Sequence, residues 1–121
     1  MNVALWVLQI FFAVLFLVHA LVHYFPPAAL RAEMDKQNIP RMRALSNGSE
    51  VLAAIGLVVP PAVGIAPWLA PLAALGLVIV MIGAATFHLS RREFPVVVFT
   101  LLLAGGLAFL AYGRTFIAPF D

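Results

Sequence analysis

Residues 51–90 read VLAAIGLVVPPAVGIAPWLAPLAALGLVIVMIGAATFHLS and contain no charged side chain. A membrane-spanning helix needs about 20 mostly apolar residues, so this stretch is too long for one span and long enough for two. It is interrupted near its middle, at residues 60–67, by three prolines and a glycine, which break helices and form tight connections. The stretch therefore predicts a helical hairpin with spans over about 44–59 and 68–89.

Uncharged stretches on either side of this hairpin supply two more helices. The first predicts a span over 3–25, which ends before Pro26 because proline cannot continue a helix. The second predicts a span over 95–113. The expected fold is an all-α membrane protein, a bundle of four transmembrane helices that forms a single domain over residues 1–121.

The composition excludes several classes of protein. Apolar residues make up 64% of the chain and charged residues 10%, against about 45–50% and about 25% in soluble domains. The lipid bilayer is therefore an expected partner. The absence of cysteine excludes disulfides and thiolate chemistry, and a net charge of +2, split by apolar runs, does not suggest nucleic-acid binding. No GxSxG, P-loop or GxGxxG motif supports a hydrolase or nucleotide-binding enzyme.

The basic residues predict an orientation. With four spans, the loops at 26–46 and 90–93 share one side and carry every lysine and arginine except Arg114. Short loops rich in lysine and arginine remain in the cytoplasm. We therefore expect a multi-pass protein of the bacterial inner membrane with both termini outside the cytoplasm.

Residues 28–46 are too many for a tight turn. They predict a short helix at the membrane surface, with Leu30, Met34 and Ile39 in contact with lipid headgroups.

Polar residues inside a span cost free energy and tend to mark function. Helical spacing places Gln9, His19 and His23 on one face of the first helix, and Arg43, Asn47 and Glu50 on one face of the second. The third helix contributes His88, and the fourth contributes Thr100. A rise of about 1.5 Å per residue brings His19, Glu50 and His88 to similar depth in the cytoplasmic half. This arrangement predicts a polar pocket that opens toward the cytoplasm.

We assign candidate catalytic roles to Glu50, His19, His23 and His88, because a carboxyl group and imidazoles in an apolar pocket suit acid–base chemistry. Candidate ligand-binding residues are Gln9, Asn47, Arg43 and Thr100. Each assignment has a structural alternative: the histidines at the helix ends can simply meet water, and Glu50 can pair with Arg43 or a histidine to hold the helices together. The His19/His23 pair resembles half of a helical metal site, but no HExxH motif is present and no metal is expected.

Several motifs resemble the DoxX-like family. They are Gly48-Ser49-Glu50 through Gly56-Leu57 to Pro60, then Ala66-Pro67-Trp68, Pro71-Leu72-Ala73-Ala74, Met81, Ala85, His88-Leu89 and Glu93-Phe94, together with an opening helix that ends at Pro26. The resemblance implies a small four-helix membrane protein. Glu50 and His88 correspond to a carboxylate and a histidine of the family pattern, whereas the His19/His23 pair departs from it.

The resemblance leaves two kinds of function open. Some members are linked to membrane oxidoreductase systems that handle thiosulfate, quinone or oxidative stress, and broadly similar bundles isomerise sterols or terpenoids. These imply a quinone-, terpenoid- or sterol-like lipophilic molecule, bound by a redox-complex subunit or a small isomerase-type enzyme, with quinone as the candidate cofactor. Other members resemble chaperones for membrane receptors. They imply a non-enzymatic assembly factor that docks another membrane protein or a second copy of itself.

Overall fold

The structure is a computed structural model that describes residues 1–120. In chain order the helices are α1 (Asn2–Tyr24), α2 (Ala28–Gln37), α3 (Pro40–Val63), α4 (Leu69–Ser90) and α5 (Phe94–Tyr112), which continues into one π-helical turn, η1 (Gly113–Ile117). The described residues form no strand. Four helices are long and apolar enough to cross a membrane: α1, α3, α4, and α5 together with η1. The prediction of an all-α bundle with four spans is confirmed.

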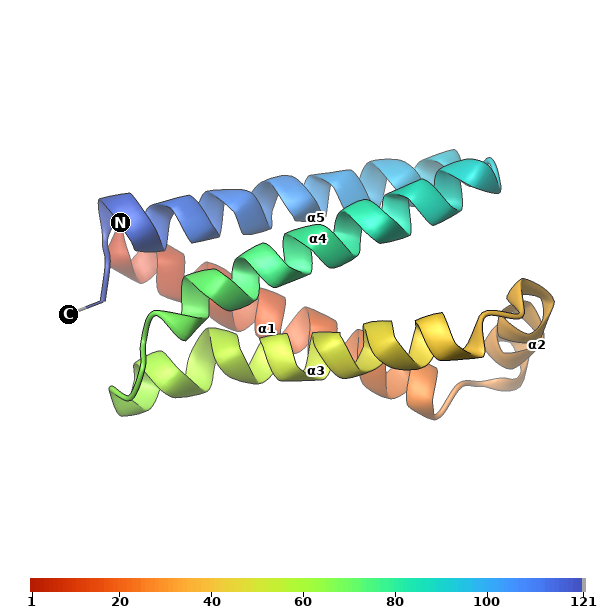
Figure 1. Cartoon of the computed structure of the whole chain (residues 1–121), viewed down its shortest axis with the longest axis horizontal. Helices are drawn as coiled ribbons and strands as arrows, with labels where there is room; N and C mark the ends of the chain where they lie inside the picture. The colour runs from red at the N-terminus through yellow and green to blue at the C-terminus, as the bar shows by residue number, and fades with distance from the viewer. Residues whose placement is uncertain (121) are drawn as a thin grey trace.

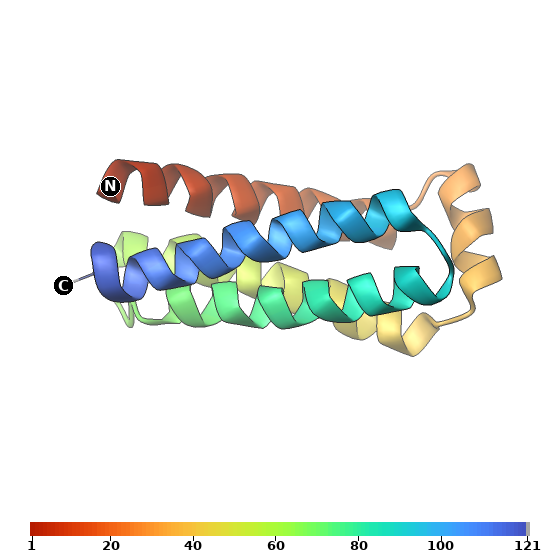
Figure 2. The ribbon, with the colours of Figure 1, turned by 90° about the horizontal axis from the view of Figure 1, so that it is seen from above.

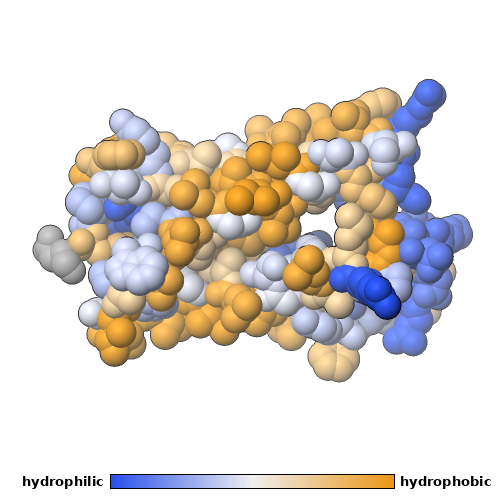
Figure 3. Space-filling model, in the orientation of Figure 1, coloured by the Kyte–Doolittle hydropathy of each residue, from blue (hydrophilic) through white to orange (hydrophobic). Residues whose placement is uncertain are grey.

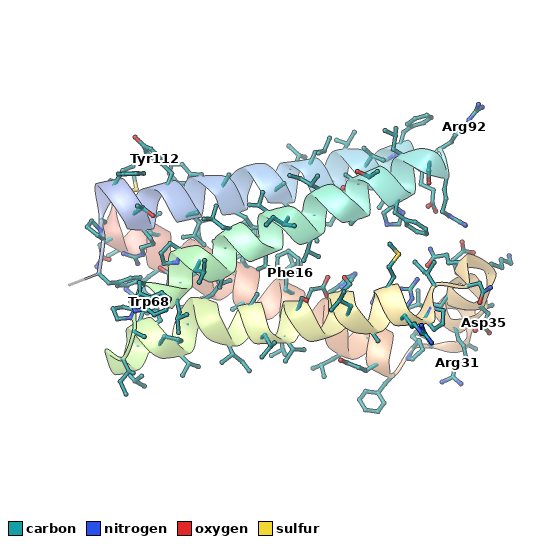
Figure 4. The ribbon with its side chains drawn as sticks, viewed as in Figure 1. Phe16, Arg31, Asp35, Trp68, Arg92 and Tyr112 are labelled. Atoms are coloured by element: carbon teal, nitrogen blue, oxygen red, sulfur yellow. The ribbon has the colours of Figure 1, made fainter. Side chains whose placement is uncertain are left out.

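The four long helices lie side by side, with α1 packed on α3, α3 on α4, and α4 on α5 (Figures 1 and 2). The short helix α2 lies across one end, and both termini lie at the other; we call these the α2 end and the terminal end. Hydrophilic side chains gather at the α2 end (Figure 3). The labelled side chains agree, because Arg31, Asp35 and Arg92 lie at the α2 end, and Trp68 and Tyr112 toward the terminal end (Figure 4).

The helices α1 and α5 approach each other closely toward the terminal end. A Cβ atom added at Gly106 would lie 2.8 Å from Cζ of Phe12, and one at Gly113 would lie 2.7 Å from Cδ2 of Leu5. Both distances are too short for a real contact, so a larger residue at either position would require the Phe12 or Leu5 side chain to shift. Close packing over small residues commonly stabilises the association of helices in lipid.

The predicted end of the second span at residue 59 is wrong, because α3 continues through Pro60 and Pro61 to Val63. Pro61 has no N–H group, so the carbonyl of Leu57 loses its helical partner. The side chain of Gln9 replaces that partner: its Nε2 donates a hydrogen bond of 2.6 Å to the Leu57 oxygen. The helix ends instead at Gly64, whose φ of 75° lies in the left-handed region that glycine adopts readily.

The surface helix predicted within residues 28–46 is shorter than that segment. It ends at Gln37, because Asn38 takes the left-handed conformation (φ 52°) as its C-cap, and Pro40 begins α3. Asparagine tolerates this conformation better than most residues, and proline fits the first turn of a helix. The half-buried residues of α2 are Leu30, Glu33, Met34 and Gln37, which share one face by helical spacing.

Candidate functional site

A cavity of about 620 Å³ lies among the helices at the α2 end. The space-filling view is hollowed here, between the α4–α5 pair and α3 (Figure 3). The volume is within the range of about 300–1,000 Å³ that small-molecule sites occupy. The part of the wall nearest the middle of the bundle is apolar, and Phe16 lies there between the helix pairs (Figure 4); it is lined by Leu15, Phe16, Val80, Met81 and Leu103.

The inner face of α2 covers the end of this cavity. Leu30, Met34 and Ile39 line the cavity wall, and their contact with lipid headgroups stays a prediction. They are only partly exposed, since packing over the cavity removes apolar area from water. Arg31 and Asp35 lie on the exposed side of the same helix (Figure 4).

Glu50 and His19 meet at the cavity wall. Only 1% of Glu50 is exposed, and Nδ1 of His19 lies 2.8 Å from Oε2 of Glu50, a hydrogen bond between α1 and α3. Half of the His19 side chain remains exposed. The pair therefore connects a buried carboxyl group to an accessible imidazole, an arrangement that can pass a proton between the cavity and its surroundings.

His23 supports His19 from the next helical turn. Its Nδ1 donates a hydrogen bond of 2.8 Å to the carbonyl oxygen of His19, and the centroids of the two rings are 4.2 Å apart. Because a carbonyl can only accept, this bond places the proton of His23 on Nδ1 when the ring is neutral. His23 also lines the cavity.

Arg43 and Asn47 line the cavity on the same face of α3 as Glu50. Arg43 donates a hydrogen bond to Oε1 of Gln37 on α2, and no ion pair joins it to Glu50, so the pairing considered above is not formed. Asn47 is 4% exposed, and among residues 1–120 its side chain makes no hydrogen bond. Asn47 therefore presents an unpartnered amide to the cavity.

His88 and Thr100 line the cavity from α4 and α5. Nδ1 of His88 lies 2.9 Å from Oε1 of Glu93, in the loop that follows α4, so its partner is not Glu50. The hydrogen bond from His88 lowers the pKa of Glu93 below its ordinary value, and Arg91 adds to the effect. The hydroxyl of Thr100 donates to the carbonyl of Val97 (2.9 Å), which leaves its oxygen free to accept.

Gln9 does not line this cavity, which corrects its assignment as a ligand-binding residue. It is fully buried on α1 toward the terminal end, where Nε of Arg114 donates a 2.5 Å hydrogen bond to its Oε1. Gln9 and His23 share a face of α1 by helical spacing, but the cavity reaches only the part of α1 from Leu15 onward. Gln9 instead links η1 to the gap in α3 at Leu57.

Arg114 was not expected to be buried, and it is 3% exposed. Its Nη1 donates to Oδ1 of Asn2 (2.6 Å) and to the carbonyl oxygen of Ala118 (3.0 Å). Its guanidinium carbon lies 5.5 Å from the ring centroid of Trp6 and 4.1 Å from that of Phe120. The terminal half of the bundle therefore contains a buried cation in addition to Gln9. Two features of the sequence indicate this cluster: the polar residue Gln9 in the first span and the single basic residue Arg114 at the end of the last.

Among residues 1–120, no group of three or more His, Asp or Glu side chains is arranged to hold a metal ion. In the described chain, the Glu50–His19 pair lies in the wall of the cavity.

Comparisons with known proteins bear on the family alone. Searches of curated proteins and of solved structures find no match. A search against protein families finds the DoxX-like family over residues 7–111, which include the cavity, the Glu50–His19 pair and all but the last residue of α5. The match covers most of the sequence and confirms the resemblance seen in its motifs. The chain belongs to the DoxX-like family.

Proposed function

We propose that this protein binds a lipophilic small molecule, quinone-like or terpenoid- or sterol-like, in the cavity at the α2 end. Its role would be that of a redox-complex subunit or a small isomerase-type enzyme. The observation that carries the proposal is the Glu50 carboxyl group, 1% exposed and hydrogen-bonded to His19, in the wall of a cavity of about 620 Å³. Polar residues in membrane spans are costly, and a buried carboxyl group is retained where it has a partner or a function.

The chemistry proposed for the pair is proton transfer to or from the bound molecule. A quinone that accepts electrons from a partner subunit must also take up protons at its oxygens, and an isomerase must remove a proton and return one. Glu50 faces the cavity and His19 is half exposed, so the two can exchange a proton with the bound molecule and then with the surroundings. A chaperone or assembly factor, the alternative role, does not need an open cavity.

Filling the cavity from Gly83 tests the proposal. A Cβ atom added at Gly83 meets nothing within 4 Å, and Gly83 lines the cavity, so we expect the side chain of Gly83→Leu to take up cavity space. We expect purified Gly83→Leu to lose the thermal stabilisation that decylubiquinone, farnesol or a sterol gives the wild-type protein. Replacing a helical glycine also favours the helix by about 0.5–1 kcal/mol, so the unliganded variant should be no less stable.

Gly76→Leu is the matched control. Gly76 lies two turns earlier on the same face of α4, also has no atom within 4 Å of an added Cβ, and does not line the cavity. It should keep the ligand response of the wild-type protein. Equal responses in the two variants would refute binding in this cavity and favour the non-enzymatic role.

The orientation is part of the same proposal. Both termini lie at one end, and the basic loops lie at the other, which we assign to the cytoplasm of a bacterial cell. A fluorescent reporter that matures only in the cytoplasm should be silent when fused after the last residue, and alkaline phosphatase at the same place should be active. The reverse pattern would place the cavity on the outer side of the membrane.

A further inference from the structure

One face of α3 carries three polar groups that border the cavity. Arg43, Asn47 and Glu50 follow one another at i, i+4 and i+7, and all three line the cavity wall. At about 1.5 Å of rise per residue, Arg43 and Glu50 are separated by about 10 Å along the helix. A bound molecule that extends along α3 would therefore meet a cation, an amide and a carboxyl group in turn.

Not every charged side chain around the cavity has a partner of opposite charge. Its acidic side chains are Glu33 and Glu50. Glu33 pairs with Lys36 and Arg91, and Glu50 pairs with His19. Within residues 1–120, Arg43 has no carboxylate within 4.0 Å, and its hydrogen-bond partner is the neutral amide of Gln37. Arg43 is thus a cation in the cavity wall that the described chain does not neutralise.

Asn47 supplies a second hydrogen-bonding group at the same place. It is 4% exposed, has no hydrogen-bond partner among the described residues, and borders the cavity one turn deeper than Arg43. No side-chain nitrogen or oxygen of residues 1–120 is both fully buried and without a partner, so the amide atoms of Asn47 are accessible at the cavity wall, where a bound molecule can become their hydrogen-bond partner. The Asn47 NH₂ group and the Arg43 guanidinium both donate hydrogen bonds, and an oxygen anion accepts from both.

We propose that the ligand of this cavity is a lipophilic acid, whose carboxylate or phosphate group binds Arg43 and Asn47. Its apolar body extends past Glu50 and His19 toward Phe16 and Met81, so the group on which Glu50 acts lies about 10 Å from the anion. This inference rests on the proposed function and narrows its ligand class from neutral lipids to anionic ones. An acidic phospholipid of the bilayer shares the same chemistry, so its headgroup is the second source of such an anion.

Three compounds with one skeleton test the proposal: farnesol, farnesoic acid and farnesyl phosphate. Their binding to the full chain is measured by titration in nanodiscs of phosphatidylcholine, which carry no net charge. Hydrogen bonds between charged partners contribute about 1.5–3 kcal/mol, so the acid or the phosphate should bind at least about tenfold more tightly than the alcohol. Arg43→Gln should remove this preference, because the affinity for the acid and the phosphate falls to about that for farnesol. Asn47→Leu should weaken binding of the anion several-fold, and it serves as the test if Arg43→Gln does not fold.

Arg41→Gln is the matched control. Arg41 is exposed, lies two residues before Arg43 and does not line the cavity. It should keep the preference for the anion; if it loses the preference as Arg43→Gln does, general surface charge explains the result and the proposal is overturned. Exchanging a third of the phosphatidylcholine for phosphatidylglycerol separates the two sources of the anion. A phospholipid ligand would displace the farnesyl compounds, whereas a free lipophilic acid would remain bound.

Different results would refute the anion site and the proposed function. If farnesol or decylubiquinone binds and the acid and phosphate bind no more tightly than farnesol, the anion site is refuted and the proposed function stands. If neither the farnesyl compounds nor decylubiquinone or a sterol bind, the proposed function fails as well.

Discussion

Glu50→Gln is expected to abolish ligand binding and any turnover while the protein stays as stable as the wild type or becomes more so. Glutamine keeps the volume of the side chain and can still accept a hydrogen bond from Nδ1 of His19, which lies 2.8 Å from the carboxyl group. Glu50 is 1% exposed, and burying an ionised carboxyl group costs free energy. Glutamine cannot ionise, so the substitution removes this cost. It also removes the proton that a bound molecule would exchange. Binding is measured by titration with the ligand that stabilises the wild type, and stability by thermal unfolding in detergent.

Glu93→Gln is the matched control for this experiment. Glu93 also accepts a hydrogen bond from a histidine Nδ1, at 2.9 Å, but it lies in the loop after α4 and does not line the cavity. It should retain ligand binding. A Glu50→Gln protein that unfolds at a lower temperature and still binds its ligand fully would show that Glu50 holds α1 to α3 and has no catalytic role.

The fold could be predicted from the sequence because few arrangements suit such long apolar stretches. The forty residues from 51 to 90 have to form two spans, and the uncharged stretches beside them have to form one each. The structure has these four spans, with α1 ending at Tyr24, two residues before Pro26. In lipid, backbone hydrogen bonds must be satisfied within each helix, so the number of helices follows from local sequence.

The path of α3 through Pro60 and Pro61 could not be predicted in this way. Proline leaves a carbonyl without its helical partner, and whether the helix ends there depends on whether another group supplies a donor. The donor is Gln9, which is 48 residues away from Leu57 in the sequence. A local pattern contains no information about a contact of this range. The same limit explains why Gln9 was placed in the cavity.

The candidate site was predictable in part. Helical spacing placed Arg43, Asn47 and Glu50 on one face, and depth placed His19 level with Glu50; the structure brings these residues to one cavity. Helical spacing does not show which hydrogen-bond partner a side chain near the end of a helix has. His88 bonds to Glu93 in the loop after α4, and Arg43 bonds to Gln37 at the end of α2. The roles of these residues remain proposals.

Arg114→Leu is expected to cause the largest loss of stability of any change considered. It leaves Oε1 of Gln9 and Oδ1 of Asn2 without their donor, and the oxygen of Gln9, which is fully buried, costs about 1–3 kcal/mol when it is left unpaired. It also removes a cation from the faces of Trp6 and Phe120, worth about 0.5–2 kcal/mol each. For a chain of this size the thermal midpoint should fall by roughly 10 °C or more.

Two comparisons show whether this loss comes from the hydrogen bonds at the terminal end. Arg92→Leu removes an exposed arginine at the α2 end and should change the midpoint little. Arg114→Lys retains the charge but not the planar fork that reaches Gln9, Asn2 and Ala118 together, so it should recover only part of the loss. Since Gln9 also supplies the missing donor at Leu57, Gln9→Leu combined with Arg114→Leu should cost less than the sum of the single changes. Additive losses would show that Arg114 and Gln9 act independently and would refute a continuous hydrogen-bond chain from η1 through α1 to α3.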